Sequence, residues 1–187
     1  MSKFERFARL KDSVQKLPDY VWLLIGLVVA LFFQWLFWPI TREMERRGYS
    51  IVEFELAWKK TTMDQILSSW DGILDDAIRM TLLDFGFILG YTIIFLSLLS
   101  IVNRFRKTGP GVRYYEVFQK LAIVAAIADV IENLFSIYIL SYPHSYIGIS
   151  VPLMSLVSAL KWLIIATMIL ALLEGLVRGI AGKIRMF

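Results

Sequence analysis

The segment from Leu121 to Leu140 is apolar and long enough to cross a bilayer, yet it carries Asp129, Glu132 and Asn133 near its centre. A helix needs about 20 residues to span the hydrocarbon core, and a charge at that depth costs roughly 2.5–3.5 kcal/mol on insertion scales. On a helix the three polar residues are i,i+3 and i,i+4 neighbours and share one face. That face must meet protein, water or a ligand, because it cannot face lipid.

The composition is that of an integral membrane protein. Of the 187 residues 58% are hydrophobic, and the mean hydropathy is +0.64, well above that of soluble domains. The length suits a single membrane domain, residues 1–187. Cysteine is absent, which excludes disulfides and cysteine-bound metals. The only histidine is His144, and no nucleotide-binding loop or nucleophile motif is present, so we expect no metal site and no cofactor.

Four apolar segments predict an all-α fold, an integral membrane four-helix bundle. The expected spans are 21–40, 80–103, 118–141 and 151–174. Trp22, Trp35 and Trp38 lie towards the ends of the first span, as in an aromatic belt. A signal peptide is the competing interpretation of this span, but the apolar run is too long and no cleavage pattern follows it.

Small residues predict where the spans touch. Gly86 and Gly90 form a small-xxx-small ridge on the second span, and such ridges let helices approach closely. We expect this ridge to meet the third span, at its alanines Ala122, Ala125, Ala126 and Ala128.

Basic residues flank the spans and predict contact with membrane lipids. Residues 1–18 read as a basic amphipathic helix with a Ser2/Glu5 capping box, lying on an anionic membrane surface. The alternative is a solvated helix that only obeys the positive-inside rule. The 104–117 loop is also basic. The expected membrane-surface residues are Lys3, Arg6, Arg9, Lys11, Arg104, Arg106 and Lys107. Lipid phosphates explain these short segments better than nucleic acid does.

The connection 41–77 separates the first two spans. Alternating residues from Val52 to Trp58 favour an extended piece, although a helix is not excluded. An amphipathic helix is predicted over 62–77, beginning at a Thr62/Gln65 capping box, with a bend or break at Asp71-Gly72. We expect it to lie along the outer membrane surface or to cover the bundle.

Lysine and arginine counts predict the orientation. Five precede the first span, five lie in 104–120 and three in the tail 175–187, whereas the 141–150 loop has none. The positive-inside rule then places both termini in the cytoplasm, and the cell (inner) membrane is the expected location.

Helical rise predicts the depth of the charged residues. Asp129 lies roughly 12 Å from Leu121, where the apolar run of span three begins, and Lys161 lies roughly 15 Å from the start of span four, both near the midplane. A short loop makes these spans antiparallel neighbours, which predicts an Asp129–Lys161 pair. Glu132 is expected to be protonated or paired with a residue of span one such as Gln34. Asp84, Glu132 and Asn133 would continue a polar ladder towards the outer surface.

A series of short motifs runs through the last two thirds of the chain. They are Glu55-Leu-Ala-Trp58, Ile66-Leu67 with Trp70, Leu82-Leu-Asp-Phe-Gly-Phe87 with Tyr91, Ala128-Asp-Val-Ile-Glu-Asn133, Tyr142-Pro143 and Leu160-Lys-Trp162. In this order they resemble an uncharacterised family of small four-span integral membrane proteins. The resemblance implies a four-helix membrane fold, with Asp84, Asp129, Glu132, Asn133 and Lys161 at the family's polar positions. It implies no activity.

Three functions are compatible with these observations. The first is an intramembrane polar pocket that binds a small polar ligand, an ion or proton, or a lipid headgroup, with a role in transport. Its candidate residues are Asp84, Asp129, Glu132, Asn133, Lys161, Tyr91 and Glu55. The second is a non-catalytic subunit of a larger complex or a homo-oligomer, in which the charges only fix helix register. The third is a lipid-modifying enzyme that uses paired carboxylates.

Overall fold

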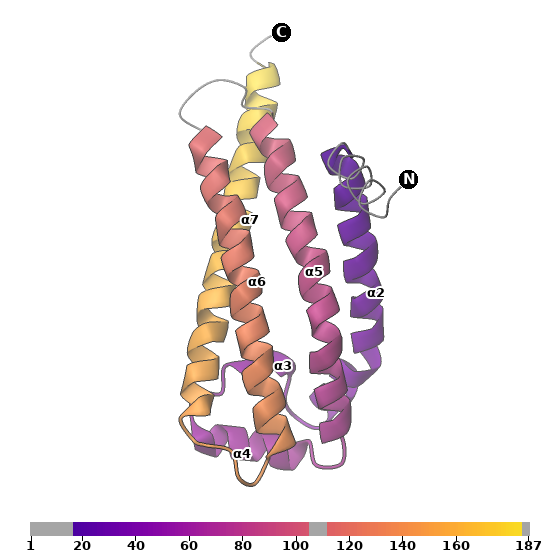
Figure 1. The fold of residues 1–187 in the computed structure, drawn as a ribbon, viewed down its shortest axis with the longest axis vertical. Helices are drawn as coiled ribbons and strands as arrows, with labels where there is room; N and C mark the ends of the chain where they lie inside the picture. The colour runs from indigo at the N-terminus through magenta and orange to yellow at the C-terminus, as the bar shows by residue number, and fades with distance from the viewer. Residues whose placement is uncertain (1–16, 105–111, 185–187) are drawn as a thin grey trace, which may run out of the picture.

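Four long helices run side by side in the computed structural model, which describes residues 17–104 and 112–184 (Figure 1). They are α2 (Asp19–Arg46), α5 (Leu74–Arg104), α6 (Val112–Ser141) and α7 (Ser150–Ile184), and each is long and apolar enough to cross a membrane. Two short helices, α3 (Ile51–Glu55) and α4 (Lys60–Ser69), join α2 to α5. The described part of the chain contains no strand. The all-α prediction and the four apolar helices are therefore confirmed.

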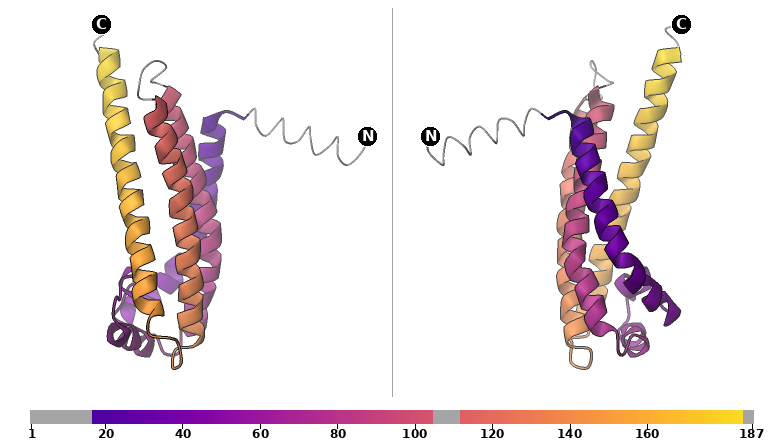
Figure 2. Two further views of the ribbon diagram at one scale, coloured as in Figure 1. Left: turned by 60° about the vertical axis from the view of Figure 1, so that its left-hand side comes forward. Right: turned by 90° about the vertical axis from the view of Figure 1, so that its right-hand side faces the viewer.

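The long helices alternate in direction. Helix α2 begins and α7 ends at one end of the molecule, whereas α3, α4 and the 142–149 turn lie at the other (Figure 1). Helix α5 packs along α2 on one side and α6 on the other, and α6 packs along α7. Helix α2 packs mainly against α5, and its axis is inclined to that of α7 (Figure 2). The region between α2 and α7 is therefore not filled by direct helix packing.

The glycine ridge faces α2 and not α6, so the predicted ridge–alanine contact is wrong. A Cβ atom on Gly90 would lie 2.7 Å from the backbone nitrogen of Ala30, and one on Gly86 would lie 2.0 Å from the Phe33 ring. A Cβ atom on Gly26 of α2 would lie 3.0 Å from the Gly90 carbonyl oxygen. The glycine ridge is thus the surface of α5 against which α2 packs.

Two of the four predicted alanines of α6 belong instead to a separate apolar cluster, which lies towards the C-terminal end of α7. Ala122 and Ala125 are buried there with side chains of α5 and α7. The other buried members are Leu99, Tyr115, Phe118, Ile164, Met168 and Ala171. This cluster fills one half of the interior with apolar atoms.

The connection between α2 and α5 differs from the expectation in three ways. Helix α2 continues to Arg46, past the predicted end at residue 40. The alternating stretch is helical from Ile51 to Glu55, because Ser50 and Glu53 form a capping box at its start. Helix α4 begins at Lys60 without a side-chain cap, so the Thr62/Gln65 box is wrong.

The predicted helix 62–77 is two helices. Helix α4 ends at Ser69, a turn follows, and α5 starts at Leu74, six residues before the predicted span. The break lies at the expected Asp71-Gly72, where Gly72 has a φ of 84° that favours glycine. The turn sets α4 across the ends of the long helices (Figure 1).

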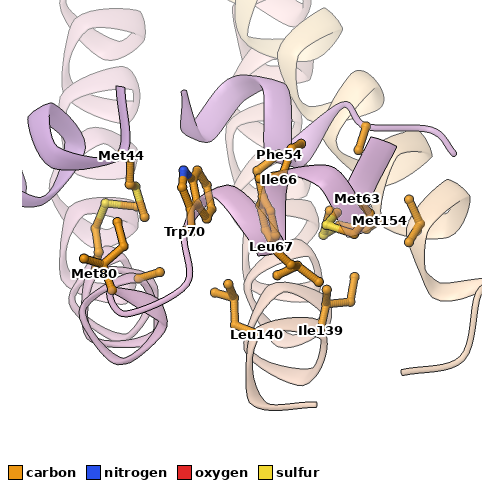
Figure 3. Close-up of a cluster of buried hydrophobic side chains, with 14 of the residues drawn as sticks. Met44, Phe54, Met63, Ile66, Leu67, Trp70, Met80, Ile139, Leu140 and Met154 are labelled. Atoms are coloured by element: carbon orange, nitrogen blue, oxygen red, sulfur yellow. The ribbon is translucent and has the colours of Figure 1, made fainter. Parts of the chain in front are cut away.

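A large apolar cluster holds α3 and α4 against the long helices (Figure 3). The Phe54 ring stacks on the Trp70 ring with 5.3 Å between centroids, and both side chains are fully buried. Around them lie Met44, Met63, Ile66, Leu67, Met80, Ile139, Leu140 and Met154. Aromatic burial of this extent fixes the position of α3 firmly. Helix α3 therefore lies at the side of the long helices, near the end of the molecule that carries α4, and not beyond that end (Figure 1).

Several predicted features lie outside the described residues. These are most of the helix 1–18 with Lys3, Arg6, Arg9 and Lys11, and the loop residues Arg106 and Lys107. Arg104 is described: it ends α5 and pairs with Asp19 of α2 at 2.9 Å. Near the end of α7, Glu174 and Arg178 form an i,i+4 ion pair at 2.5 Å.

Candidate functional site

Lys161 is the centre of a buried polar layer between the two apolar clusters. Its side chain comes from α7, is 4% exposed and contacts three carboxylates. The Nζ atom donates to Asp129 Oδ1 at 3.0 Å and to Glu132 Oε1 at 2.9 Å, and it lies 3.5 Å from Glu55 Oε2. The predicted Asp129–Lys161 pair is confirmed, and Glu132 pairs with Lys161 and not with Gln34. Lys161 thus joins α7 to α6 and to α3 through charge-assisted contacts.

Helices α5 and α6 supply the other polar groups. The Tyr91 hydroxyl of α5 donates to Asp129 Oδ2 at 2.8 Å, so both oxygens of Asp129 accept a hydrogen bond. Two turns away on α5, Asp84 Oδ2 accepts from Asn133 Nδ2 at 2.8 Å. The i,i+4 spacing of Asp129 and Asn133 on α6 directs both towards α5. The expected ladder of Asp84, Asn133 and Asp129 is therefore present.

Glu55 enters the layer from α3. The Trp162 indole Nε1 donates to its Oε2 at 3.1 Å. The chain is held at this depth by a second contact, in which the Trp58 backbone N–H donates to Ser155 Oγ at 3.0 Å. Trp58 has a φ of 56°, a strained value for a bulky residue. The strain is tolerated because the buried contacts of α3 fix the backbone on both sides.

Burial raises the pKa of the Glu55 carboxyl to about 8, because lost hydration outweighs the attraction of Lys161. A folded-state pKa above the unfolded value of 4.5 means that the folded state binds the proton more tightly. Its contribution to stability is therefore complete below about pH 4.5 and is lost as the pH rises to about 8. At neutral pH the Glu55 carboxyl is mostly protonated.

Glu55→Gln is expected to weaken the fall in stability between pH 5 and pH 8. The free energy of unfolding, measured across this range by tryptophan fluorescence in detergent micelles, checks this. Glu45→Gln is the matched control, since Glu45 is exposed on α2 and should leave the wild-type pH dependence intact. An identical pH dependence in Glu55→Gln and wild type would contradict the assignment.

A cavity of about 410 Å³ opens beside this layer. Its floor is formed by the polar groups of the predicted site, and Thr81 and Ser136 add hydroxyls. Its walls are mainly apolar: Phe37, Ile51, Val52, Met80, Phe87, Phe95 and Ile165. Gln34 of α2 and Trp162 of α7 line it and are exposed. The mouth therefore lies between α2 and α7, at the depth of the spans.

All seven predicted ligand-binding candidates line this one cavity. The sequence interpretation missed Trp162 as a contact of Glu55, and it missed the aromatic wall. Phe87, Tyr91 and Phe95 follow an i,i+4,i+8 spacing, which places them on one helix face. That spacing could have identified the wall, whereas no local pattern indicates that α3 reaches Lys161.

No family model, curated protein or solved structure matches this chain. The function therefore has to be inferred from the site itself. Within the described ranges, no three His, Cys, Asp or Glu side chains are grouped as a metal site. The site consists instead of a lysine–carboxylate cluster, an unfilled space beside it and an apolar wall.

Proposed function

We propose that this protein binds the polar headgroup of a membrane amphiphile, which enters the cavity from the bilayer between α2 and α7. The observation that carries the proposal is the 410 Å³ cavity with a charged floor and apolar walls. Ligand pockets of about 300–1,000 Å³ accommodate small molecules and usually combine apolar walls with a few polar groups. A headgroup would meet the floor, and the adjoining chain would lie along the apolar wall.

The distribution of polar groups favours binding over conduction. The polar layer occupies the middle of the helices, and the apolar cluster around Leu99, Ile164 and Met168 fills the interior on the side of the α7 C-terminal end. An ion crossing the membrane would have to pass this mainly apolar cluster, and losing its polar partners there would cost several kcal/mol. The cavity therefore resembles a binding pocket closed at one end more than a pathway.

A structural role is the second candidate, and one observation favours it. Lys161 contacts three carboxyl groups at once, so its ion pairs link α3, α6 and α7. Buried pairs of this kind fix helix register. This role explains the ion pairs but not the cavity beside them.

A lipid-modifying enzyme is less well supported. General acid–base catalysis requires a carboxylate that can exchange a proton with the substrate. Asp129 holds hydrogen bonds on both oxygens, and Glu132 faces the Lys161 ammonium. Both acids therefore already have partners within the protein.

The basic segments before α2, after α5 and in the tail support an orientation with both termini in the cytoplasm. The cavity, α3 and α4 then lie in the outer half of a cell membrane, where lipids of the outer leaflet would reach the mouth.

Val52→Trp tests the proposed function, because Val52 lines the cavity from α3 and is 42% exposed. The indole should occupy the cavity without disturbing the core. Native mass spectrometry of the protein released from mild detergent should show wild-type protein with retained lipid and Val52→Trp with at least about a tenfold lower retained fraction, equivalent to about 1.4 kcal/mol.

Val117→Trp is the matched control, because Val117 is 53% exposed on α6 and does not line the cavity. It should retain lipid as the wild type does. Equal lipid retention in all three proteins would mean that bound lipid lies elsewhere, and the proposed function would be wrong.

A further inference from the structure

We infer that the headgroup taken by this cavity carries an ammonium group, and that Asp84 is the carboxylate that binds it. This inference rests on the proposed function and specifies its ligand. Three features of the cavity support it: its charge balance, the unused hydrogen-bond acceptors on its floor and the aromatic rings in its wall.

The charge balance favours a cation. Four carboxyl groups line the cavity, and Lys161 is the only lysine or arginine among its lining residues. The Lys161 ammonium has three N–H donors, and these face Asp129, Glu132 and Glu55. No donor of Lys161 is left for a phosphate or another anion. A ligand cation would instead balance the excess of acidic groups.

Unused acceptors mark where the cation would bind. Asp84 is half-buried, and its Oδ2 accepts from Asn133, whereas its Oδ1 accepts no hydrogen bond from any described residue. On the same floor, Glu132 Oε2 lies 2.8 Å from Lys161 Nζ but accepts no well-directed hydrogen bond, although Glu132 is only 2% exposed. A buried acceptor without a donor is costly, which applies to Glu132 Oε2. Asp84 Oδ1 is an acceptor on the same cavity that is open to an ammonium N–H.

Aromatic rings form a continuous row in the lining of the cavity that Asp84 also lines. Phe37 contacts Phe87 with 5.7 Å between ring centroids, Phe87 contacts Tyr91 at 5.8 Å, and Tyr91 contacts Phe95 at 6.3 Å. All four line the cavity. Aromatic faces attract ammonium groups, and proteins use several rings together to recognise them. A carboxylate beside such rings is the chemistry of an ammonium site.

The test compares headgroups on identical acyl chains. Phosphatidylethanolamine, phosphatidylcholine and phosphatidylglycerol are titrated onto the full chain in a neutral maltoside detergent, and bound lipid is quantified by native mass spectrometry. The two ammonium lipids should bind at least about tenfold more tightly than phosphatidylglycerol. Tetramethylammonium and ethylammonium, added as soluble competitors, distinguish a free amine from a lipid headgroup. Displacement of lipid by millimolar competitor would identify a free amine as the ligand.

Asp84→Asn should remove the preference for ammonium lipids, and Asp84→Glu should restore part of it. Phe95→Leu, at a partly exposed position in the cavity wall, should weaken the binding of ammonium lipids several-fold and leave the binding of phosphatidylglycerol unchanged. Asp64→Asn, on α4 outside this cavity, is the control and should match the wild type.

The outcomes separate the two proposals. Equal or tighter binding of phosphatidylglycerol, blocked by Val52→Trp, would overturn the ammonium inference and leave the pocket function standing. Binding of all three lipids that Val52→Trp does not change would overturn both. A headgroup preference that survives Asp84→Asn in a folded protein would remove Asp84 from the site.

Discussion

Replacing Lys161 with methionine is expected to destabilise the protein by about 3–5 kcal/mol, the usual cost of removing one partner of a buried ion pair. Methionine preserves the length and apolar stem of the side chain but leaves Asp129 and Glu132 facing each other without a cation. The free energy of unfolding, measured in mixed detergent–dodecyl sulfate micelles, should show this loss.

Two comparisons separate charge from packing. Lys60→Met breaks an exposed pair with Asp64, at 2.8 Å, and should cost less than about 1 kcal/mol. Combining Lys161→Met with Asp129→Asn and Glu132→Gln removes the unpaired charges and should recover most of the stability. A loss in Lys161→Met no larger than that in Lys60→Met would mean that the cluster contributes little to the fold.

Gly90→Val is expected to be the other severe substitution, with a loss of about 1–3 kcal/mol or more from overpacking. The new Cβ would lie 2.7 Å from the backbone nitrogen of Ala30, and backbone cannot move aside as a side chain can. Since α2 has α5 as its main partner, the whole helix must shift. The shift also displaces Gln34 and Phe37 and opens the cavity, so lipid binding should fall with stability.

Gly148→Val provides the control for Gly90→Val, because a Cβ there meets only the Lys60 side chain, at 3.4 Å. Its stability and lipid binding should stay near the wild-type values. If Gly90→Val were as stable as Gly148→Val, α2 would not be seated on the glycine ridge.

The sequence predicted the features that follow from lipid as a solvent. Four apolar runs had to be helices, because unpaired backbone groups are too costly in hydrocarbon. Asp129 and Lys161 had to be shielded, and the short turn between α6 and α7 left few geometries other than a direct pair. Strong energetic penalties made these predictions reliable.

The sequence did not predict which helices pack together or where short helices begin, because several arrangements of similar free energy compete. The ridge at Gly86 and Gly90 could have met either α2 or α6, since both carry small residues, and spacing does not rank them. The Thr62/Gln65 box matched a pattern, but α4 begins earlier at Lys60 because packing sets its start. The position of Glu55 depends on the buried rings of Phe54 and Trp70, which come together only in the folded protein.

The pairing of Lys161 with carboxylates from α6 imposes an order on biosynthesis. Asp129 and Glu132 leave the ribosome before Lys161, which follows 32 and 29 residues later. Helix α6 has no ammonium partner until α7 has also emerged, and inserting α6 alone would cost roughly 2.5–3.5 kcal/mol for each charge. Until α7 emerges, protonation of Asp129 and Glu132 or contact with the insertion machinery would lower this cost. Once α7 is in place, its ion pairs with α6 stabilise both helices in the membrane.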